Sequence, residues 1–181
     1  MEKTLFQIFK TPSSSFSQSS LKKVYYDLMK KVHPDASSAI PVREKEALSG
    51  FLSQAYAKLK DDYRRSVYSY SVEHNKNLVQ RTFANVQDFF GTGDTLTVID
   101  TAKDRVGCDR KMVDPEFLDR ILSLEDAIEH STPEELQGLE RTVAEEIDKC
   151  RRNSTDLMHL VRWRYFNRLL ESVRNKELGQ C

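Results

Sequence analysis

The amino-acid sequence predicts an all-α fold with two helical domains. Apolar residues recur at the 3.6-residue period of amphipathic helices in residues 21–59 and again in residues 117–170. Six glycines and five prolines in 181 residues are few enough for long helices. Hydrophobic residues make up 39% of the chain and can build modest cores. No run approaches the roughly 18 apolar residues of a membrane span, so we expect no membrane partner.

The first long helix is predicted over residues 21–32. Its apolar side chains share one face, namely Leu21, Val24, Tyr25, Leu28 and Val32. The opposite face is mostly cationic and carries Lys22, Lys23, Tyr26 and Lys30. Pro34 lacks a backbone N–H group and disfavours a helical conformation at His33, so the helix must end there. The triplet His33-Pro34-Asp35 is therefore expected on an exposed loop.

A second long helix is expected after Pro41. Its apolar side chains again fall on one side, namely Leu48, Phe51, Leu52, Ala55 and Leu59. Because a tight loop joins the two helices, they should pack as an antiparallel hairpin.

The order of these features closely resembles a J domain, the DnaJ-like domain of co-chaperones. Three further segments match this domain. The first is a short first helix over Thr4-Leu5-Phe6-Gln7-Ile8-Phe9, where Thr4 and Gln7 have capping-box spacing. The other two resemble its third and fourth helices, namely Gln54-Ala55-Tyr56-Ala57-Lys58-Leu59, and Asp61-Asp62-Tyr63-Arg64-Arg65 with Tyr68. The resemblance covers residues 4 to about 71, and we assign residues 1–71 to this domain. It implies docking on a DnaK-type heat-shock chaperone and stimulation of ATP hydrolysis by that chaperone.

The resemblance also implies which residues bind the chaperone, namely His33, Pro34, Asp35, Lys22, Lys23 and Lys30. Asp35 would engage an arginine of the partner, and the lysines would meet an acidic surface. Taken singly, each residue is better explained by a plain structural role, since lysines are usually a solvated surface and a histidine before a proline usually just ends a helix. Taken together and in this order, they favour the J domain.

Residues 72–113 are expected to link two domains. Apolar spacing predicts a helix over residues 74–90, and Gly91-Thr92-Gly93-Asp94 gives a turn signal after it. The segment 95–99 is β-prone but short, so it is either a strand or an extended linker. Residues 100–111 are charged and poorly periodic, which favours a mobile connection.

Residues 114–181 predict a three-helix bundle. Asp114-Pro115 starts a helix with a core stripe of Phe117, Ile121, Leu124 and Ile128. Thr132-Pro133-Glu134-Glu135 combines a cap, a proline at the first helical position and a capping-box glutamate. A third helix is expected from Asp156 to Lys176, and its arginines should complement the acidic second helix.

A J domain followed directly by such a bundle resembles the HscB family of iron–sulfur co-chaperones, whose two domains form an L. The segments that carry this resemblance are residues 114–124 and 163–169. It implies delivery of an IscU-type scaffold to a DnaK/HscA-type chaperone. The implied scaffold-binding residues are Leu118, Leu122, Arg164 and Tyr165. Periodicity displaces Leu118 and Leu122 from the core stripe, which favours an exposed apolar ridge. The alternative is that both leucines widen the core stripe.

Charge and cysteine usage narrow the function classes further. Residues 1–71 hold 12 lysines and arginines against 7 acidic residues, whereas residues 72–181 hold 16 against 21, which suggests two partners. Nucleic acid is a poor candidate, because a phosphate-binding domain should be more basic. Cys108, Cys150 and Cys181 form no Cys-x-x-Cys pair, so we expect a reducing compartment and no metal site or cofactor.

We therefore expect a co-chaperone that is not an enzyme. The family resemblance implies a location in the mitochondrion or a mitochondrion-derived organelle. The alternative is the cytoplasm, since no presequence is recognisable. The alternatives are a J-domain co-chaperone for another client and, from another class, a hydrolase or redox enzyme using Cys150 and His159. No third group that would orient such a pair is apparent in the sequence.

Overall fold

The computed structural model describes residues 2–33, 35, 41–86, 95–107 and 113–179. The chain divides into two compact units, Met1–Asp104 and Arg105–Cys181. The N-terminal unit contains β1 (Glu2–Thr4), α1 (Leu5–Ile8), a 3-10 turn η1 (Ser13–Ser15), α2 (Gln18–Val32), α3 (Val42–Lys60), α4 (Asp62–Glu73), β2 (Leu78–Ala84) and β3 (Thr95–Thr101). The C-terminal unit contains α6 (Pro115–His130), α7 (Pro133–Arg152) and α8 (Leu157–Gly179).

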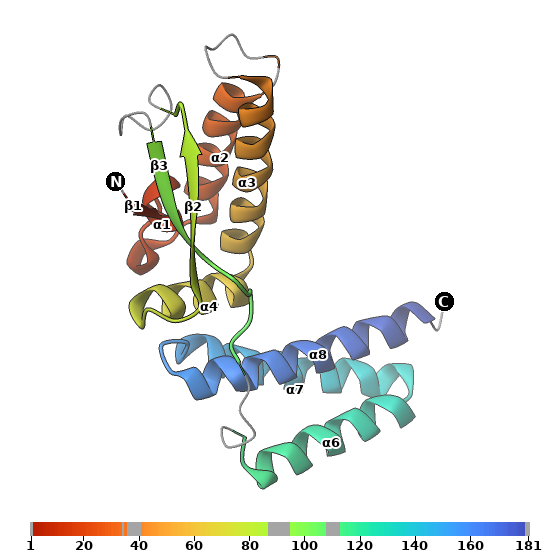
Figure 1. Ribbon diagram of the computed structural model, residues 1–181. Helices are drawn as coiled ribbons and strands as arrows, with labels where there is room; N and C mark the ends of the chain where they lie inside the picture. Colours follow the sequence, from red (N-terminus) through yellow and green to blue (C-terminus); the bar gives the residue numbers. More distant parts are fainter. Residues whose placement is uncertain (1, 34, 36–40, 87–94, 108–112, 180–181) are drawn as a thin grey trace. The chain divides into compact units, whose positions relative to one another are not determined.

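The two long helices of the N-terminal unit pack as the expected antiparallel hairpin (Figure 1). The predicted apolar side chains of α3 are all buried, and those of α2 are buried or half-buried. Fully burying one leucine or valine contributes about 1.5–3 kcal/mol, so these two faces hold the hairpin together.

Local signals set the helix ends in this unit. Thr4 and Gln7 form the predicted capping box of α1. Asp61 caps α4, where its carboxylate accepts a hydrogen bond of 2.8 Å from the Arg64 backbone N–H. α2 ends at His33, whose backbone is extended with φ −58° and ψ 140°, as the following proline requires.

A small three-stranded sheet corrects the prediction of an all-α protein. Its strand order is β1-β3-β2, with β1 parallel to β3 and β2 antiparallel to it. The helix predicted over residues 74–90 is wrong, because residues 78–84 pair with residues 95–101 in the register Leu78↔Thr101 to Ala84↔Thr95. Residues 87–90 of that helix and the turn predicted at 91–94 lie outside the described residues.

The strand β3 packs into the core of the N-terminal unit. Leu96 and Val98 are fully buried in the same cluster as the side chains of the helical hairpin. Tyr68 of α4 joins the layers, because its hydroxyl accepts a hydrogen bond from Leu5 N–H and donates one to the Ile99 carbonyl, each at 2.8 Å. Burial raises the pKa of the Tyr68 phenol far above its usual value. The segment 95–99 is thus a strand of the core.

A buried ion pair fastens the end of β3 to α3. Lys58 Nζ contacts the Asp100 carboxylate, which is 7% exposed, and lies 3.0 Å from both Thr101 Oγ1 and Asp104 Oδ1. Arg81 Nε of β2 approaches the same Asp100 carboxylate at 3.4 Å. Residue 100 was expected to begin a mobile connection, but it is buried as part of this ion-pair cluster.

The C-terminal unit begins its helices at the predicted residues. The Asp114 carboxylate caps α6 by accepting a hydrogen bond from Phe117 N–H at 2.7 Å, and Thr132 and Glu135 form the capping box of α7. α8 packs along α7 and also against α6 (Figure 1). The core includes Phe117, Ile121, Leu136, Val143, Ile147, Leu160, Val161, Trp163, Phe166, Leu169 and Val173.

The charge pairing between these helices differs from the expectation. Of the α8 arginines, Arg174 meets α7, with its Nε 3.9 Å from the Glu140 carboxylate. Arg162 and Arg168 instead reach Asp114 before α6 and Glu125 within it, at 2.9 and 3.8 Å. The acidic face of α7 therefore lies mostly toward solvent or toward α6 rather than toward the arginines of α8.

Candidate functional site

The outer face of α2 presents cations to solvent. Lys22, Lys23 and Lys30 lie on this face, and all three are exposed, as predicted. Lys22 Nζ lies 6.0 Å from the ring centroid of Tyr26, itself 53% exposed, and this contact restrains the lysine on the helix surface. Among the described residues, none of the three lysines lies within ion-pair distance of a carboxylate. Their charges are therefore available to an acidic partner.

The loop after α2 carries His33 and Asp35, whose side chains are 58% and 90% exposed. The Asp35 backbone N–H donates a hydrogen bond to His33 Nδ1 at 3.3 Å, and the Asp35 carboxylate lies 3.4 Å from the same nitrogen. Pro34, the third predicted residue of this site, lies outside the described residues. The exposed Asp35 carboxylate can accept the paired, charge-assisted hydrogen bonds that an arginine donates.

An aromatic contact holds α2 against α3 and so fixes the position of this basic face. The Tyr25 ring stacks on the Tyr56 ring with centroids 4.2 Å apart, and the Tyr25 hydroxyl is 3.2 Å from Ser53 Oγ. Helix periodicity placed Tyr25 on the buried face but did not pair it with Tyr56. The sequence signal that could have predicted this contact is that Tyr25 and Tyr56 lie at the margins of the two apolar faces that pack against each other.

The predicted client-binding residues lie on α6 and α8. Leu118 and Leu122 are 38% and 61% exposed, so the structure does not bury them in the core stripe. Tyr165 and Arg164 are half-buried on α8. The Tyr165 ring meets the Phe117 ring edge-on, with centroids 5.7 Å apart. This contact brings the aromatic residue of α8 to the first turn of α6, which also carries Leu118.

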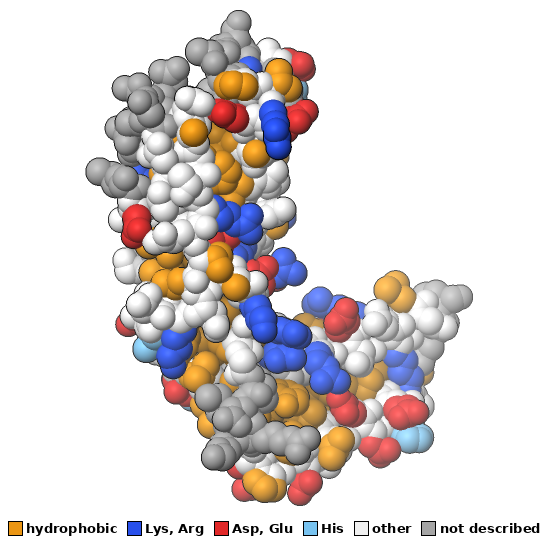
Figure 2. Space-filling view, in the orientation of Figure 1, with side chains coloured by type: hydrophobic (Ala, Val, Ile, Leu, Met, Phe, Trp, Pro, Cys, Tyr) orange, Lys and Arg blue, Asp and Glu red, His pale blue; other side chains and the backbone are white. Residues whose placement is uncertain are grey.

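Acidic and basic groups surround this apolar ridge of Leu118 and Leu122. Figure 2 shows hydrophobic side chains at the surface along α6 with acidic side chains beside them. Arg162 places its guanidinium 5.1 Å from the Phe117 ring centroid and 2.9 Å from the Asp114 carboxylate. The Phe117 N–H, followed by Arg162, holds the pKa of Asp114 below its usual value. An apolar ridge with a charged rim is the usual composition of a protein-binding surface.

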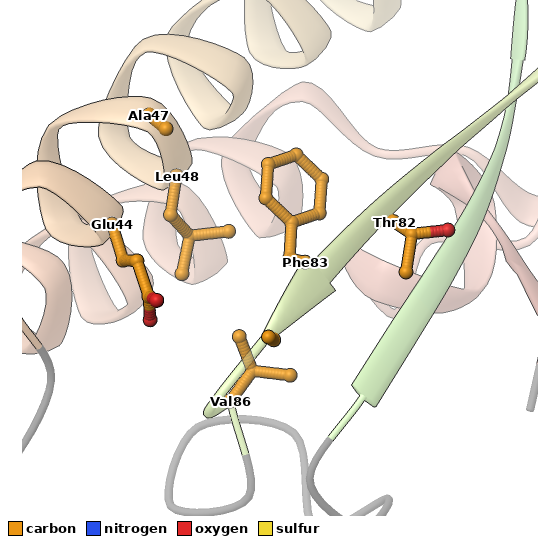
Figure 3. Close-up of a pocket in the computed structure, with 7 residues that line it drawn as sticks. Glu44, Ala47, Leu48, Thr82, Phe83 and Val86 are labelled. Atoms are coloured by element: carbon orange, nitrogen blue, oxygen red, sulfur yellow. The ribbon is translucent and has the colours of Figure 1, made fainter.

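A separate apolar pocket of about 300 Å³ opens between α3 and β2 (Figure 3). Leu48 of α3 and Phe83 of β2 form opposite walls, and Val86 closes the base. The Glu44 carboxylate at its edge accepts hydrogen bonds from the Asn85 amide at 2.9 and 3.1 Å. The lining suits an apolar side chain. Sequence patterns gave no sign of this pocket, because residues 74–90 were predicted as a helix.

The two residues considered for catalysis, Cys150 and His159, lie in different surroundings. Cys150 is buried, and desolvation together with the nearby Glu146 carboxylate raises the pKa of its thiol to about 11. His159 Nδ1 lies 2.6 Å from the Asp156 carboxylate, and this contact lowers the pKa of Asp156. Within the described ranges, no group of three histidine, cysteine or acidic side chains is placed to hold a metal ion. No helix in the described part of the chain is long and apolar enough to span a membrane.

Comparison with known proteins matches residues 4–69 to the DnaJ domain family. No solved structure matches the chain. The matched residues run from the capping box of α1 to α4 and include the basic face of α2 and the exposed loop. J domains bind Hsp70-type chaperones. Residues 4–69 of this chain are therefore a J domain.

Proposed function

We propose that this protein is a co-chaperone that stimulates the ATPase of a DnaK/HscA-type chaperone and delivers an IscU-type iron–sulfur scaffold to it. The observation that carries the first half is the exposed His33 and Asp35 loop at the end of the basic helix α2, inside a matched J domain. The observation that supports the second half is the exposed ridge of Leu118 and Leu122 beside Tyr165.

The chaperone contact would combine two kinds of interaction. The lysines of α2 would attract an acidic surface at long range, which raises the rate of encounter more than the final affinity. Asp35 would then pair with an arginine of the chaperone, and His33, held within hydrogen-bond distance of Asp35, would orient the loop. Neither step needs a bond to be made or broken by this chain, so the protein is proposed as a regulator rather than as an enzyme.

The client contact would be made by the C-terminal helices. Exposed leucines are costly for solubility unless a partner covers them, and aromatic side chains commonly anchor such contacts. Tyr165 and Arg164 would complete the ridge on the α8 side. Holding the scaffold on one unit while the other triggers ATP hydrolysis would trap the scaffold on the chaperone. A mitochondrial or mitochondrion-derived location belongs to this proposal through the family resemblance alone.

The first test replaces His33 by Gln in the full chain. Stimulation of the chaperone ATPase should be lost, while helical circular dichroism and scaffold binding stay at wild-type values, because an exposed loop residue contributes little to the core. Charge reversal at Lys22 and Lys30 should weaken stimulation by degrees, and raised salt should shrink the difference. Full stimulation by the His33→Gln variant would exclude the assignment.

The second test concerns the client. Combined Leu118→Ala, Leu122→Ala and Tyr165→Ala changes should weaken scaffold binding by about a hundredfold or more, equivalent to ~2.7 kcal/mol. Leu178→Ala is a matched control, because Leu178 is 75% exposed on α8 but remote in sequence from the ridge. The melting temperature should fall little in both variants. The triple variant contradicts the proposal if it is destabilised but its folded molecules still bind the scaffold with wild-type affinity. The three residues would then belong to the core, and the client site would lie elsewhere.

A second candidate function is that of a J-domain co-chaperone for another client. The apolar pocket between α3 and β2 supports this alternative, because its lining suits an apolar side chain of a client. Capture of partners from the native lysate separates the two functions. Recovery of an iron–sulfur scaffold together with the chaperone supports the first, and recovery of the chaperone with a different protein supports the second.

A further inference from the structure

A second hollow of the J domain lies between its first residues and α2. This pocket of about 370 Å³ has an apolar floor of Ile8, Val24 and Leu28. Ile8 and Leu28 are buried core residues, whereas Val24 is half-buried and faces the pocket. An apolar side chain of a partner could rest on this floor.

The rim of the same pocket is cationic. Lys3 of β1, Lys10 after α1 and Lys31 of α2 line it, against a single carboxylate from Asp27. Among the described residues, none of these three lysines forms an ion pair. The local excess is therefore two positive charges around an apolar floor, which complements a segment whose apolar side chain is flanked by carboxylates.

The pocket is continuous with the basic face of α2. On a helix, residues three and four apart are neighbours, so Asp27 lies one turn from Lys23 and from Lys30, and Lys31 follows Lys30 directly. A partner that covers Lys23 and Lys30 would thus reach the edge of the pocket without leaving α2.

We propose that this pocket binds an acidic segment of the chaperone, and that one apolar side chain of that segment anchors it. The chaperone is the same one that the loop and the lysines of α2 engage, so this inference rests on the proposed function. The contact adds affinity and does not trigger hydrolysis, because the pocket contains neither His33 nor Asp35. Its loss should therefore change the concentration at which the co-chaperone acts and leave the maximal rate intact.

The test uses the full chain with both Lys3 and Lys10 changed to Glu, and measures chaperone ATPase against co-chaperone concentration at low salt. The half-maximal concentration should rise about tenfold or more, equivalent to ~1.4 kcal/mol, with unchanged maximal stimulation. The matched control changes Lys60 and Lys103 to Glu, two exposed lysines of the same unit outside the pocket. An equal rise in both variants would mean that only overall charge matters, and would overturn the proposal.

A second variant, Val24→Ser, tests the apolar anchor. It should raise the half-maximal concentration about threefold, and this rise should persist at high salt because it comes from lost apolar burial rather than charge. No change would refute the anchored segment. A loss of scaffold affinity in place of the ATPase shift would assign the pocket to the client and also overturn the proposal.

The outcomes separate this inference from the proposed function. If wild-type protein stimulates the ATPase, His33→Gln does not, and the Lys3 and Lys10 variant behaves as wild type, the inference fails while the proposed function stands. If wild-type protein gives no stimulation, the proposed function fails first.

Discussion

At the residue scale, Lys176 of α8 caps the C-terminal end of another helix, α6. Lys176 of α8 donates hydrogen bonds to the backbone carbonyls of Ile128, Glu129 and Ser131 at 2.7, 2.7 and 2.8 Å. The last carbonyls of a helix have no partner within it, and a cation at that end also interacts favourably with the helix dipole. Lys176 therefore ties α8 to the C-terminal end of α6.

Replacing Lys176 by Met should lower the free energy of unfolding of the C-terminal unit by about 1–3 kcal/mol, since half-buried carbonyls lose a charged donor. Urea denaturation followed by circular dichroism measures the change. Lys149→Met is the control, because Lys149 itself is exposed and its partner Glu146 keeps a second cation, Arg120, at 2.8 Å, so the loss should be small. Equal effects of the two variants would contradict the capping role.

The cap of α6 should make stability depend on pH. The Phe117 N–H, followed by Arg162, lowers the pKa of Asp114 in the folded state, so the carboxylate binds its proton less readily when folded than when unfolded. Its contribution is thus present above the unfolded pKa of about 4 and is lost as pH falls through the lower folded value. The melting temperature of the full chain should decline in this range, and less so in Asp114→Asn. An identical decline in the variant would assign the effect to other carboxyl groups.

At the element scale, the long helices were predictable from the sequence, whereas β1 and β2 were not and β3 was one of two alternatives for residues 95–99. Repeating apolar faces and local caps such as Thr4 and Thr132 define each helix within a few residues of chain. β2 was mistaken for part of a helix, because Leu78, Val79, Phe83 and Val86 have nearly helical spacing in the sequence. Its partner β3 also pairs with β1, which lies more than 90 residues away in the sequence, and no local pattern reports such a pairing.

The buried pair of Lys58 and Asp100 should hold the sheet to α3. Lys58→Met leaves the buried Asp100 carboxylate with Arg81 as its remaining cation and should cost up to about 3–5 kcal/mol in the free energy of unfolding. Adding Asp100→Leu should recover a large part of the loss, because two apolar groups replace the ion pair. Guanidinium denaturation of the single and double variants gives the comparison. No recovery in the double variant would show that Lys58 acts through its other contacts.

At the scale of the whole molecule, the candidate sites divide between the two units. The candidate chaperone-binding residues could be proposed from the sequence because they form a motif on contiguous sequence, His33 to Asp35 after a basic helix. The exposure of Leu118 and Leu122 followed from helix phase. The Lys3 and Lys10 pocket was not foreseen, because it joins β1 and the end of α1 to α2 through tertiary packing that no spacing encodes.

The boundary of the N-terminal unit can be tested by truncation. A chain of residues 1–104 should fold and stimulate the chaperone ATPase without binding the scaffold, since it retains β3 and the ion pair of Asp100. A chain of residues 1–71 should melt at a markedly lower temperature, because it lacks the buried Leu96 and Val98. Calorimetry of both chains decides the point, and equal melting temperatures would make the sheet dispensable.

The parallel pairing of β1 with β3 constrains the order in which the protein can fold during synthesis. Thr4 pairs with Ile99, so the first strand made has no partner until some 95 further residues have been added. At about 5–20 residues per second, the helical hairpin is complete several seconds before that partner exists. The contact order of the N-terminal unit is correspondingly higher than that of a helical hairpin alone, and its last folding step is a long loop closure. Although β1 is translated before the helical hairpin, it is therefore among the last elements of this unit to reach its native place.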